Sequence, residues 1–429
     1  MLFYVETYGC QMNEYDSRMI ASILSASGHT ETPYPLEADV VMVNTCSVRE
    51  RAERRVFGRL RHLRGLIRPT ASLGIVGCVA QRLGSSLLSE IDGLGFVVGT
   101  DCYDRLPRVL DAVRAGARAV EVGVRPKQIY EHRPLRTAAS TSEFVTIMRG
   151  CNNFCSYCIV PHVRGRERSR PSASIVDEVA ELVGLGARDV TLLGQNVNSY
   201  RDGEHDFADL LSVIDVIPGL ERIRFATSHP KDLSEKLIDT IASLRKVCDH
   251  VHLPVQSGSD AILAAMGRGY TREHYLSLVG TLRASNPEIA LTTDIIVGFP
   301  GESTEDFEAT ESLLRVVRFD SAFMFRYSER EGTAAAELED GVPEKTKLDR
   351  LRRIIELQKT ITGEINNGLV GRRLKVLVEG PSEKNPDVLF GRTSTAKAVV
   401  FPGSDVPGTV RSVTITRASA WTLHGTVDT

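Results

Sequence analysis

No stretch of this 429-residue sequence stays apolar over the roughly 20 residues that a helix needs to cross a bilayer, which argues against an integral membrane protein. Residues 1–6 also lack the charged and then apolar pattern of an export signal. Long repeats and low-complexity tracts are missing, and a composition of 42% apolar and 25% charged residues excludes a mostly disordered chain. The sequence therefore predicts a globular cytoplasmic protein, and its length predicts two or three domains.

A strong net charge is also missing, since 52 basic and 55 acidic residues leave a charge of −3. A nucleic-acid partner would therefore have to be held by local basic patches. Residues 49–68 form one such patch, with apolar residues on the opposite helical face, and both a solvated helix and a phosphate-binding surface fit this pattern. A second group lies at 164–170, where the arginines would pair either with a substrate backbone or with neighbouring acids. The arginines of the first patch are Arg49, Arg51, Arg54, Arg55, Arg59, Arg61, Arg64 and Arg68.

Disulfides are not expected in a reducing compartment, so clustered cysteines indicate metal ligands or catalysts. Three of the eight cysteines, Cys151, Cys155 and Cys158, lie within eight residues directly after a predicted strand. With no fourth cysteine nearby, such a loop would hold three irons of a [4Fe–4S] cluster and leave the fourth iron open. A structural zinc site is the alternative, but it normally has four ligands, and His132 and His162 provide no matching pair.

A second set of cysteines is scattered over the first 78 residues. Cys10, Cys46 and Cys78 each follow a short predicted strand. Because parallel strands end at one edge of a sheet, the three thiols are expected to converge on a second cluster site. Three separate buried thiols are the alternative. Cys102 and Cys248 are not grouped with other cysteines in this way and are expected to be core residues.

Apolar periodicity divides the chain into three predicted parts. Residues 1–118 predict a parallel α/β, flavodoxin-like domain, whose first helix is expected to be capped by Asn13 and to end at Gly28. A linker is predicted over 119–142. Residues 143–367 contain six strand–helix units, which predict a partial β/α (TIM-like) barrel. Residues 368–429 predict a small β-barrel, in which 420–425 are expected only to pack.

The loop from Cys151 to Cys158, with Tyr157 before its last cysteine, resembles the cluster loop of the radical S-adenosylmethionine superfamily, and this likeness covers 143 to about 365. The resemblance implies that the open iron binds S-adenosylmethionine and that its cleavage gives a 5′-deoxyadenosyl radical. It also implies that the segment from Asp294 to Glu302 lines the nucleoside. The implied cofactor-binding residues are Tyr157, Gly194, Gln195, Asn196, Gln256 and Asp294.

The N-terminal motifs at 7–13, 44–46 and 77–82 are similar to those of the methylthiotransferase family, and within it to the branch that acts on N6-dimethylallyl (isopentenyl) adenosine beside the anticodon of tRNA. The last part of the chain resembles the RNA-binding TRAM domain. The resemblance implies two [4Fe–4S] clusters, tRNA as partner, an electron-donor protein, a sulfur source and a monomeric enzyme that needs no acid or base. Its implied ligands and catalytic residues are Cys10, Cys46, Cys78, Cys151, Cys155 and Cys158.

Three alternatives stay open at this point. The first is a sister methylthiotransferase that acts on threonylcarbamoyl-adenosine in tRNA or on an aspartate of a ribosomal protein. The second is a non-enzymatic RNA-binding iron–sulfur sensor, which would not need to cleave S-adenosylmethionine. The third is a zinc-binding RNA module, which would be colourless, whereas iron–sulfur proteins are brown.

Overall fold

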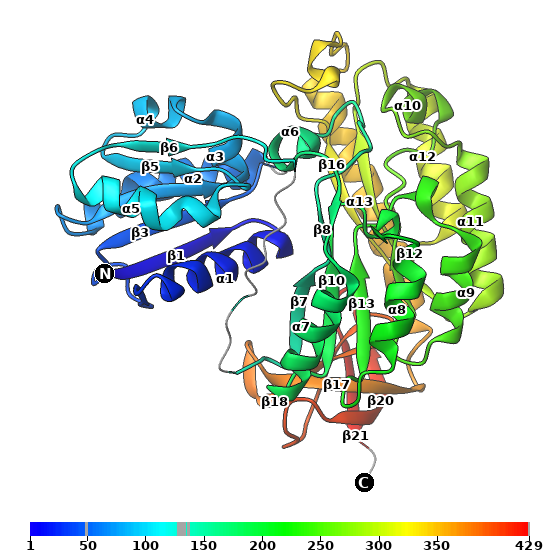
Figure 1. The fold of residues 1–429 in the computed structure, drawn as a ribbon. Coiled ribbons are helices and arrows are strands. Elements are labelled where there is room, and N and C mark those ends of the chain that lie inside the picture. Colours follow the sequence, from blue (N-terminus) through cyan, green and yellow to red (C-terminus); the bar gives the residue numbers. More distant parts are fainter. Residues whose placement is uncertain (48–49, 127–133, 135–137, 428–429) are drawn as a thin grey trace. The chain divides into compact units, whose positions relative to one another are not determined.

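The computed structural model describes residues 1–427 except 48–49, 127–133 and 135–137 (Figure 1). The chain divides into two compact units. The first contains residues 1–137, 148–154 and 158–170, and the second contains 138–147, 155–157 and 171–429. The division runs through the predicted cluster loop, so Cys151 and Cys158 belong to the first unit and Cys155 to the second. The domain boundaries at 118, 142 and 367 stay predictions.

The first unit is built on a parallel sheet with the strand order β2–β1–β3–β4–β5–β6. Helices cover both of its faces, and for this reason β3 and β4 are apolar along almost their whole length. Helices α1 and α5 pack on one face, and α2, α3 and α4 pack on the other. The predicted parallel α/β fold is confirmed. The elements are β1 (Leu2–Tyr8), α1 (Gln11–Ala26), β2 (Thr30–Glu31), β3 (Val40–Thr45), α2 (Glu50–Leu66), β4 (Ser72–Gly77), α3 (Cys78–Leu83), α4 (Ser86–Glu90), β5 (Leu94–Val98), α5 (Leu106–Arg114) and β6 (Ala119–Glu121).

The beginning of α1 differs from the prediction. Cys10, and not Asn13, is the N-cap residue, with an extended backbone at φ −98° and ψ 175°. Asn13 lies one turn into the helix and is completely buried. The predicted cap was wrong because the Asn13 amide bonds to the last two residues of β3, a contact that local sequence does not reveal. Gly28 follows the end of the helix with φ +82°, as predicted.

The second unit contains the six predicted strands of a partial β/α barrel. They form two three-stranded parallel sheets, β13–β10–β7 and β14–β15–β16, and a single bridge between Ile223 and Val247 links the two. The partial barrel is confirmed, and the long helix α13 (Glu344–Asn367) ends this part of the chain. The main elements are β7 (Ser142–Thr146), α7 (Ser172–Gly184), β10 (Asp189–Leu193), α8 (Phe207–Asp215), β13 (Arg222–Ala226), α9 (Glu235–Ser243), β14 (His250–His252), α10 (Asp260–Ala265), α11 (Arg272–Ser285), β15 (Ala290–Val297), α12 (Thr304–Val317) and β16 (Ser321–Arg326).

A closed five-stranded barrel ends the second unit, with the order β17–β18–β19–β21–β20. The sequence pattern predicts only three strands here, at 374–378, 398–401 and 410–416, so β18 and β21 were missed. The expectation that 420–425 only pack was wrong for Trp421, which is 72% exposed. The turn between β18 and β19 lies against the beginnings of the core strands: Arg224 donates to the Thr393 carbonyl at 2.8 Å and pairs with Asp189 at 2.8 Å. The strands are β17 (Arg373–Ser382), β18 (Asn385–Thr393), β19 (Ala398–Phe401), β20 (Val410–Ala418) and β21 (Leu423–Val427).

Candidate functional site: cysteines at strand ends

The first unit brings its three N-terminal cysteines to the same edge of the sheet. In the parallel register, Tyr8 of β1 pairs with Thr45 of β3, and Thr45 pairs with Gly77 of β4. Cys10, Cys46 and Cys78 follow these strand ends, and the side chains of Cys10 and Cys46 hydrogen-bond to each other. That bond, followed by Arg164, lowers the pKa of Cys10, whose side chain is exposed, to about 6. The three cysteines therefore lie at one edge of the sheet, while their role as a second cluster site stays a prediction.

Two buried asparagines hold the first two cysteine loops together. The Asn13 amide nitrogen donates to Asn44 Oδ1 at 3.1 Å and to the Thr45 carbonyl at 3.0 Å. In return, the Asn44 amide donates to the Asn13 carbonyl at 2.9 Å. The remaining Asn13 oxygen accepts from the Cys10 sulfur at 3.3 Å. Because both asparagines are 0% exposed, these bonds have no competition from water and fix Cys10 relative to Cys46.

Two glycines leave the space that this asparagine pair needs. A Cβ added at Gly9 would lie 2.4 Å from Asn13 Oδ1 and 2.8 Å from Cys46 Cβ. A Cβ at Gly77 would lie 2.4 Å from Asn44 Oδ1, and its backbone has φ +95°, which L-residues rarely adopt. Glycine is therefore required before Cys10 and before Cys78, because neighbouring side chains and backbone approach these two positions too closely for a Cβ atom.

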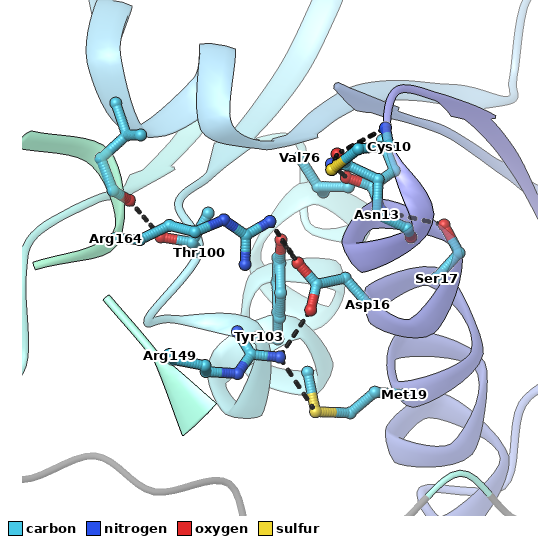
Figure 2. A network of polar contacts seen from close by, with 12 residues as sticks. Cys10, Asn13, Asp16, Ser17, Met19, Val76, Thr100, Tyr103, Arg149 and Arg164 are labelled. Atoms are coloured by element: carbon cyan, nitrogen blue, oxygen red, sulfur yellow. Dashed lines mark hydrogen bonds and ion pairs between the residues drawn. The ribbon is translucent and has the colours of Figure 1, made fainter. Parts of the chain in front are cut away.

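A buried ion cluster lies one turn further along α1 (Figure 2). Asp16 is fully buried and accepts hydrogen bonds from Arg149 at 2.5 Å and from Arg164 at 2.9 Å. Tyr103 donates to the same carboxylate at 3.4 Å. The two arginines flank the cysteine loop in sequence, one before Cys151 and one after Cys158, so the helix that begins at Cys10 is tied to both segments. Sequence reasoning missed Asp16, because nothing local distinguishes it from an ordinary helical acid.

The first-unit part of the predicted cluster loop is held by a short antiparallel pair, β8 (Met148–Arg149) with β9 (Arg168–Ser169). The Cys151 N–H donates to the Gly165 carbonyl at 3.1 Å, and the Asn153 N–H donates to the Cys151 sulfur at 3.3 Å. Backbone donors to sulfur favour the thiolate form, which is the form that binds metal. Cys151 is buried and Cys158 is half-buried.

In the second unit, Cys155 and Tyr157 lie beside a buried arginine. Arg268 donates to the Cys155 sulfur at 3.4 Å and to the Tyr157 hydroxyl at 3.5 Å. Burial alone would lower the pKa of Arg268, but Tyr157, Tyr270 and Cys155 raise it, so the guanidinium stays charged next to the sulfur. Arg268 was not identified from sequence, since it lies 113 residues from its cysteine.

The cofactor-binding residues expected in the second unit lie at or near the carboxyl ends of successive strands. Gly194, Gln195 and Asn196 directly follow β10, and Gln256 follows β14. Asp294 lies instead inside β15, with a half-exposed carboxylate 3.5 Å from His252. Asn196 Oδ1 and Gln256 Oε1 are buried without a hydrogen-bond partner among the described residues, as are the Ser228 hydroxyl and His229 Nε2 after β13. Buried polar atoms normally have partners, so this group indicates a place for a polar ligand or water.

Backbone strain occurs at the same edge. Thr227 and Gln256 have φ values of +69° and +71°, and they account for two of the four non-glycine residues with positive φ in the described chain. Such strain tends to gather at functional sites. Burial, followed by Arg268 and Lys231, lowers the pKa of His229 to about 2, so this imidazole is neutral. Its Nδ1 accepts from the Lys231 N–H at 3.2 Å, which leaves the proton on Nε2.

Other predicted residues have structural partners. Glu302 accepts from the Gly298 N–H and from Arg350, both at 2.6 Å, and therefore closes the turn after β15. Arg168 pairs with Asp101 at 2.9 Å, so this arginine and Arg164 meet neighbouring acids. In the basic patch, Arg59 pairs with Glu6 at 2.8 Å. Arg49 lies outside the described residues.

The six predicted ligands belong to a chain whose eight cysteines all lie in the described part, and none of the eight forms a disulfide. Within residues 1–427, apart from the gaps given above, no three His, Cys, Asp or Glu side chains stand in an arrangement that could already hold a metal ion. The thiols are therefore assembled by loop and strand positions without closed ligand geometry. No helix of the described chain is long and apolar enough to cross a membrane.

Comparison with protein families finds three matches along the chain. Residues 2–99 match the uncharacterized protein family UPF0004, residues 145–314 match the radical SAM superfamily, and residues 368–427 match the TRAM domain. The three matches coincide with the N-terminal sheet, most of the partial barrel and the small β-barrel.

Relatives match the chain over almost its whole length. The tRNA-2-methylthio-N(6)-dimethylallyladenosine synthases of Carboxydothermus hydrogenoformans and Moorella thermoacetica are 49% and 47% identical, each over 99% of this chain and over 98% and 97% of their own. Among solved structures, the radical S-adenosylmethionine methyltransferase TsrM from Kitasatospora setae aligns with a TM-score of 0.59 at 16% identity, covering 78% of this chain and 74% of that one. The cobalamin-dependent S-adenosylmethionine radical enzyme OxsB aligns with a TM-score of 0.51 at 12% sequence identity. This alignment covers 84% of this chain and 56% of OxsB. These two share the fold.

Proposed function

Because this chain belongs to the family of tRNA-2-methylthio-N(6)-dimethylallyladenosine synthases, we propose that it attaches a methylthio group to carbon 2 of N6-dimethylallyladenosine beside the anticodon of tRNA. The observation that carries the proposal is the convergence of Cys10, Cys46 and Cys78 at one sheet edge, in a chain that also has a radical SAM domain. Full-length identity to the named synthases supports the choice of this substrate over the sister substrates, and it disfavours the sensor and zinc-module alternatives.

The radical SAM domain implies S-adenosylmethionine and a [4Fe–4S] cluster as cofactors. The residues fit this assignment, because Cys151, Cys155 and Cys158 are three soft thiolate donors within eight residues, with N–H groups directed at two of the sulfurs. When bound, this pair of cofactors supplies a radical that can remove hydrogen from an aromatic carbon, which no side-chain base could do. Arg268 orients the Cys155 thiol and the Tyr157 hydroxyl. The polar groups that follow β10 and β14 would contact the methionine and nucleoside parts of S-adenosylmethionine.

The second cluster is part of the proposal. Cys10, Cys46 and Cys78 would hold it, and with only three thiolates it would keep one iron open to carry the sulfur that is transferred. The asparagine pair and the two glycines support this role, since they set the positions of thiols that are otherwise distant in sequence. No acid or base is required from the chain. An electron-donor protein and a sulfur source complete the proposed set of partners, with a monomeric enzyme acting in the cytoplasm.

The C-terminal barrel supplies the contact with RNA in this proposal. It matches the TRAM domain, and Trp421 is exposed in the turn between β20 and β21, where an aromatic ring can stack on a base. Its attachment to the core through Arg222 and Arg224 gives the barrel a defined position relative to β13. The substrate would thus be held by a domain that does not move freely.

The test is an anaerobic assay with prenylated tRNA and S-adenosylmethionine, in which methylthio nucleosides are measured by mass spectrometry. A triple variant, Cys10→Ala, Cys46→Ala, Cys78→Ala, is expected to form 5′-deoxyadenosine but no methylthio product. The control is Cys102→Ala, a buried thiol of the same unit, which should retain both activities. Product from the triple variant would refute the role of the three cysteines, and product only on tRNA carrying threonylcarbamoyl-adenosine would refute the substrate.

A further inference from the structure

The segment after the cluster loop brings an arginine to the N-terminal cysteines. Ile159 and Val163 pack against Cys78 in a small buried cluster. The Thr100 hydroxyl donates to the Val163 carbonyl at 2.6 Å, which anchors the backbone of α6 (Val160–Arg164) at this point. Arg164, the last residue of α6, is therefore placed beside Cys78 by packing and by a buried hydrogen bond.

The charge of Arg164 is only partly balanced by Asp16. Its Nη2 donates to Asp16 at 2.9 Å, but the same carboxylate also receives Arg149 at 2.5 Å and the Tyr103 hydroxyl at 3.4 Å. The Nη1 group of Arg164 is buried without a hydrogen-bond partner among the described residues, and its side chain is only 4% exposed. One carboxylate is thus shared between two guanidinium groups, and a buried charge is stable only when an opposite charge lies close.

We propose that Arg164, oriented by Asp16, is a positioning residue that supplies the positive charge opposite the sulfur atoms of Cys10, Cys46 and Cys78. The inference rests on the proposed function, because it requires these thiols to be the ligands of a second cluster. Three thiolates around an iron–sulfur cluster are a concentrated negative charge, and a fixed cation beside them stabilises each further negative charge that the cluster receives.

The role has two chemical consequences. Reduction adds an electron to the cluster, so the cation should raise its midpoint potential. A sulfide or methylthiolate at the open iron is also an anion, so the same cation should favour its retention. Arginine suits this position, since its planar group can bond Asp16 on one side and face the sulfurs with the remaining N–H groups. Asp16 acts through Arg164 and touches no reacting atom.

The experiment is a redox titration of the reconstituted full-length protein, followed by electron paramagnetic resonance, in wild type, Arg164→Gln, Arg164→Lys and Arg149→Gln. The cluster whose signal changes on addition of S-adenosylmethionine is the core cluster, which identifies the other as the second. We expect Arg164→Gln to shift the second cluster to lower potential and to leave the core cluster in place, with Arg164→Lys closer to wild type. Arg149→Gln removes the other partner of Asp16, which then balances the charge of Arg164 more fully, so the second cluster should shift in the same direction as in Arg164→Gln but by a smaller amount.

Iron content separates a failed inference from a failed function. Wild-type protein that binds only about four irons per chain, one [4Fe–4S] cluster instead of two, would overturn the proposed function and the inference together. About eight irons with no shift in Arg164→Gln would overturn the inference alone. If Arg164→Gln loses the second cluster entirely, retention of iron in Arg164→Lys supports a charge role. If Arg164→Gln, Arg164→Lys and Arg149→Gln all lose the same amount of iron, Arg164 has a structural role only, and the proposal is contradicted.

Discussion

At the scale of single residues, neutral and charged side chains have separate tasks in the first unit. Asn13 and Asn44 satisfy each other and join two cysteine loops without any net charge. Asp16 and its two arginines tie the same helix to the segments that flank the cluster loop. Amides near thiolates position the sulfurs without stabilising one redox state over another, which leaves that function to Arg164.

A pH dependence follows from one half-buried histidine of the second unit, His250. Burial, helped by Arg224, His252 and Lys397, lowers the pKa of His250 from 6.5 to about 3, so the folded protein keeps it neutral. The unfolded chain takes up a proton below pH 6.5 and then binds more protons than the folded one. The free energy of unfolding is therefore expected to fall as the pH drops from 6.5, by up to about 1.4 kcal/mol per pH unit from this residue.

Urea unfolding under anaerobic conditions at pH 7.5 and 5.5 measures this effect. His250→Asn should lose about 1.4 kcal/mol less stability between the two values than wild type does. His205→Asn, at an exposed position of the short strand β12 (His205–Asp206), is the matched control and should behave as wild type. Equal losses in His250→Asn and wild type would contradict the prediction.

At the scale of elements, the strands could be predicted because their cause is local. The short apolar runs at 3–6, 40–44 and 73–76 predict β1, β3 and β4 to within two residues at either end, and parallel pairing then implies that the following cysteines lie at one edge. The charged contacts could not be predicted in this way. Arg149 and Arg164 lie 133 and 148 residues from Asp16, and no periodicity encodes such a pair. Strand β18 was missed because its exposed first half carries polar residues and a proline.

The turn between β4 and α3 provides a test at this scale. Gly77→Ala forces a Cβ to within 2.4 Å of Asn44 Oδ1 and keeps φ at +95°, a strain of about 1–3 kcal/mol. We expect a lower unfolding temperature and loss of about four irons per chain, since Cys78 follows directly. Gly280→Ala in α11, where a Cβ meets nothing within 4 Å, should keep its iron and its stability. Full iron content in Gly77→Ala, measured by colorimetric iron assay, would show that the close approach is not needed.

At the scale of the second unit, the small barrel and the core are joined by buried polar contacts. Arg222 and Arg224 donate to the carbonyls of the last two residues of β18. In the turn that follows, the Ser394 hydroxyl donates to Asp249 at 2.7 Å and Lys397 pairs with Asp320 at 2.5 Å. Arg222, Arg224, Asp249 and Asp320 lie at or near the beginnings of β13, β14 and β16 in the partial β/α barrel. The turn therefore covers the end of the barrel opposite to the polar groups that follow β10 and β14.

Removal of one of these arginines should loosen the joint. Arg224→Gln leaves the buried Asp189 carboxylate without its cation, which costs about 3–5 kcal/mol. The variant is expected to unfold at lower temperature and to be cleaved sooner by protease near the barrel, as followed by mass spectrometry. Arg411→Gln removes an arginine that is half exposed and pairs with Asp405, and it should change neither property. Identical digestion of Arg224→Gln and wild type would argue against a role in docking.

The shared carboxylate of Asp16 limits how this chain can be recombined with its relatives. A chimaera joined at residue 118 or 142 would take helix α1 from one parent and both guanidinium partners from the other. A fusion at such a linker would therefore form this ion cluster only where both parents have the same residues at 16, 149 and 164. Asp16, Arg149 and Arg164 have to be exchanged together, and a chimaera joined anywhere between residues 16 and 164 would separate them.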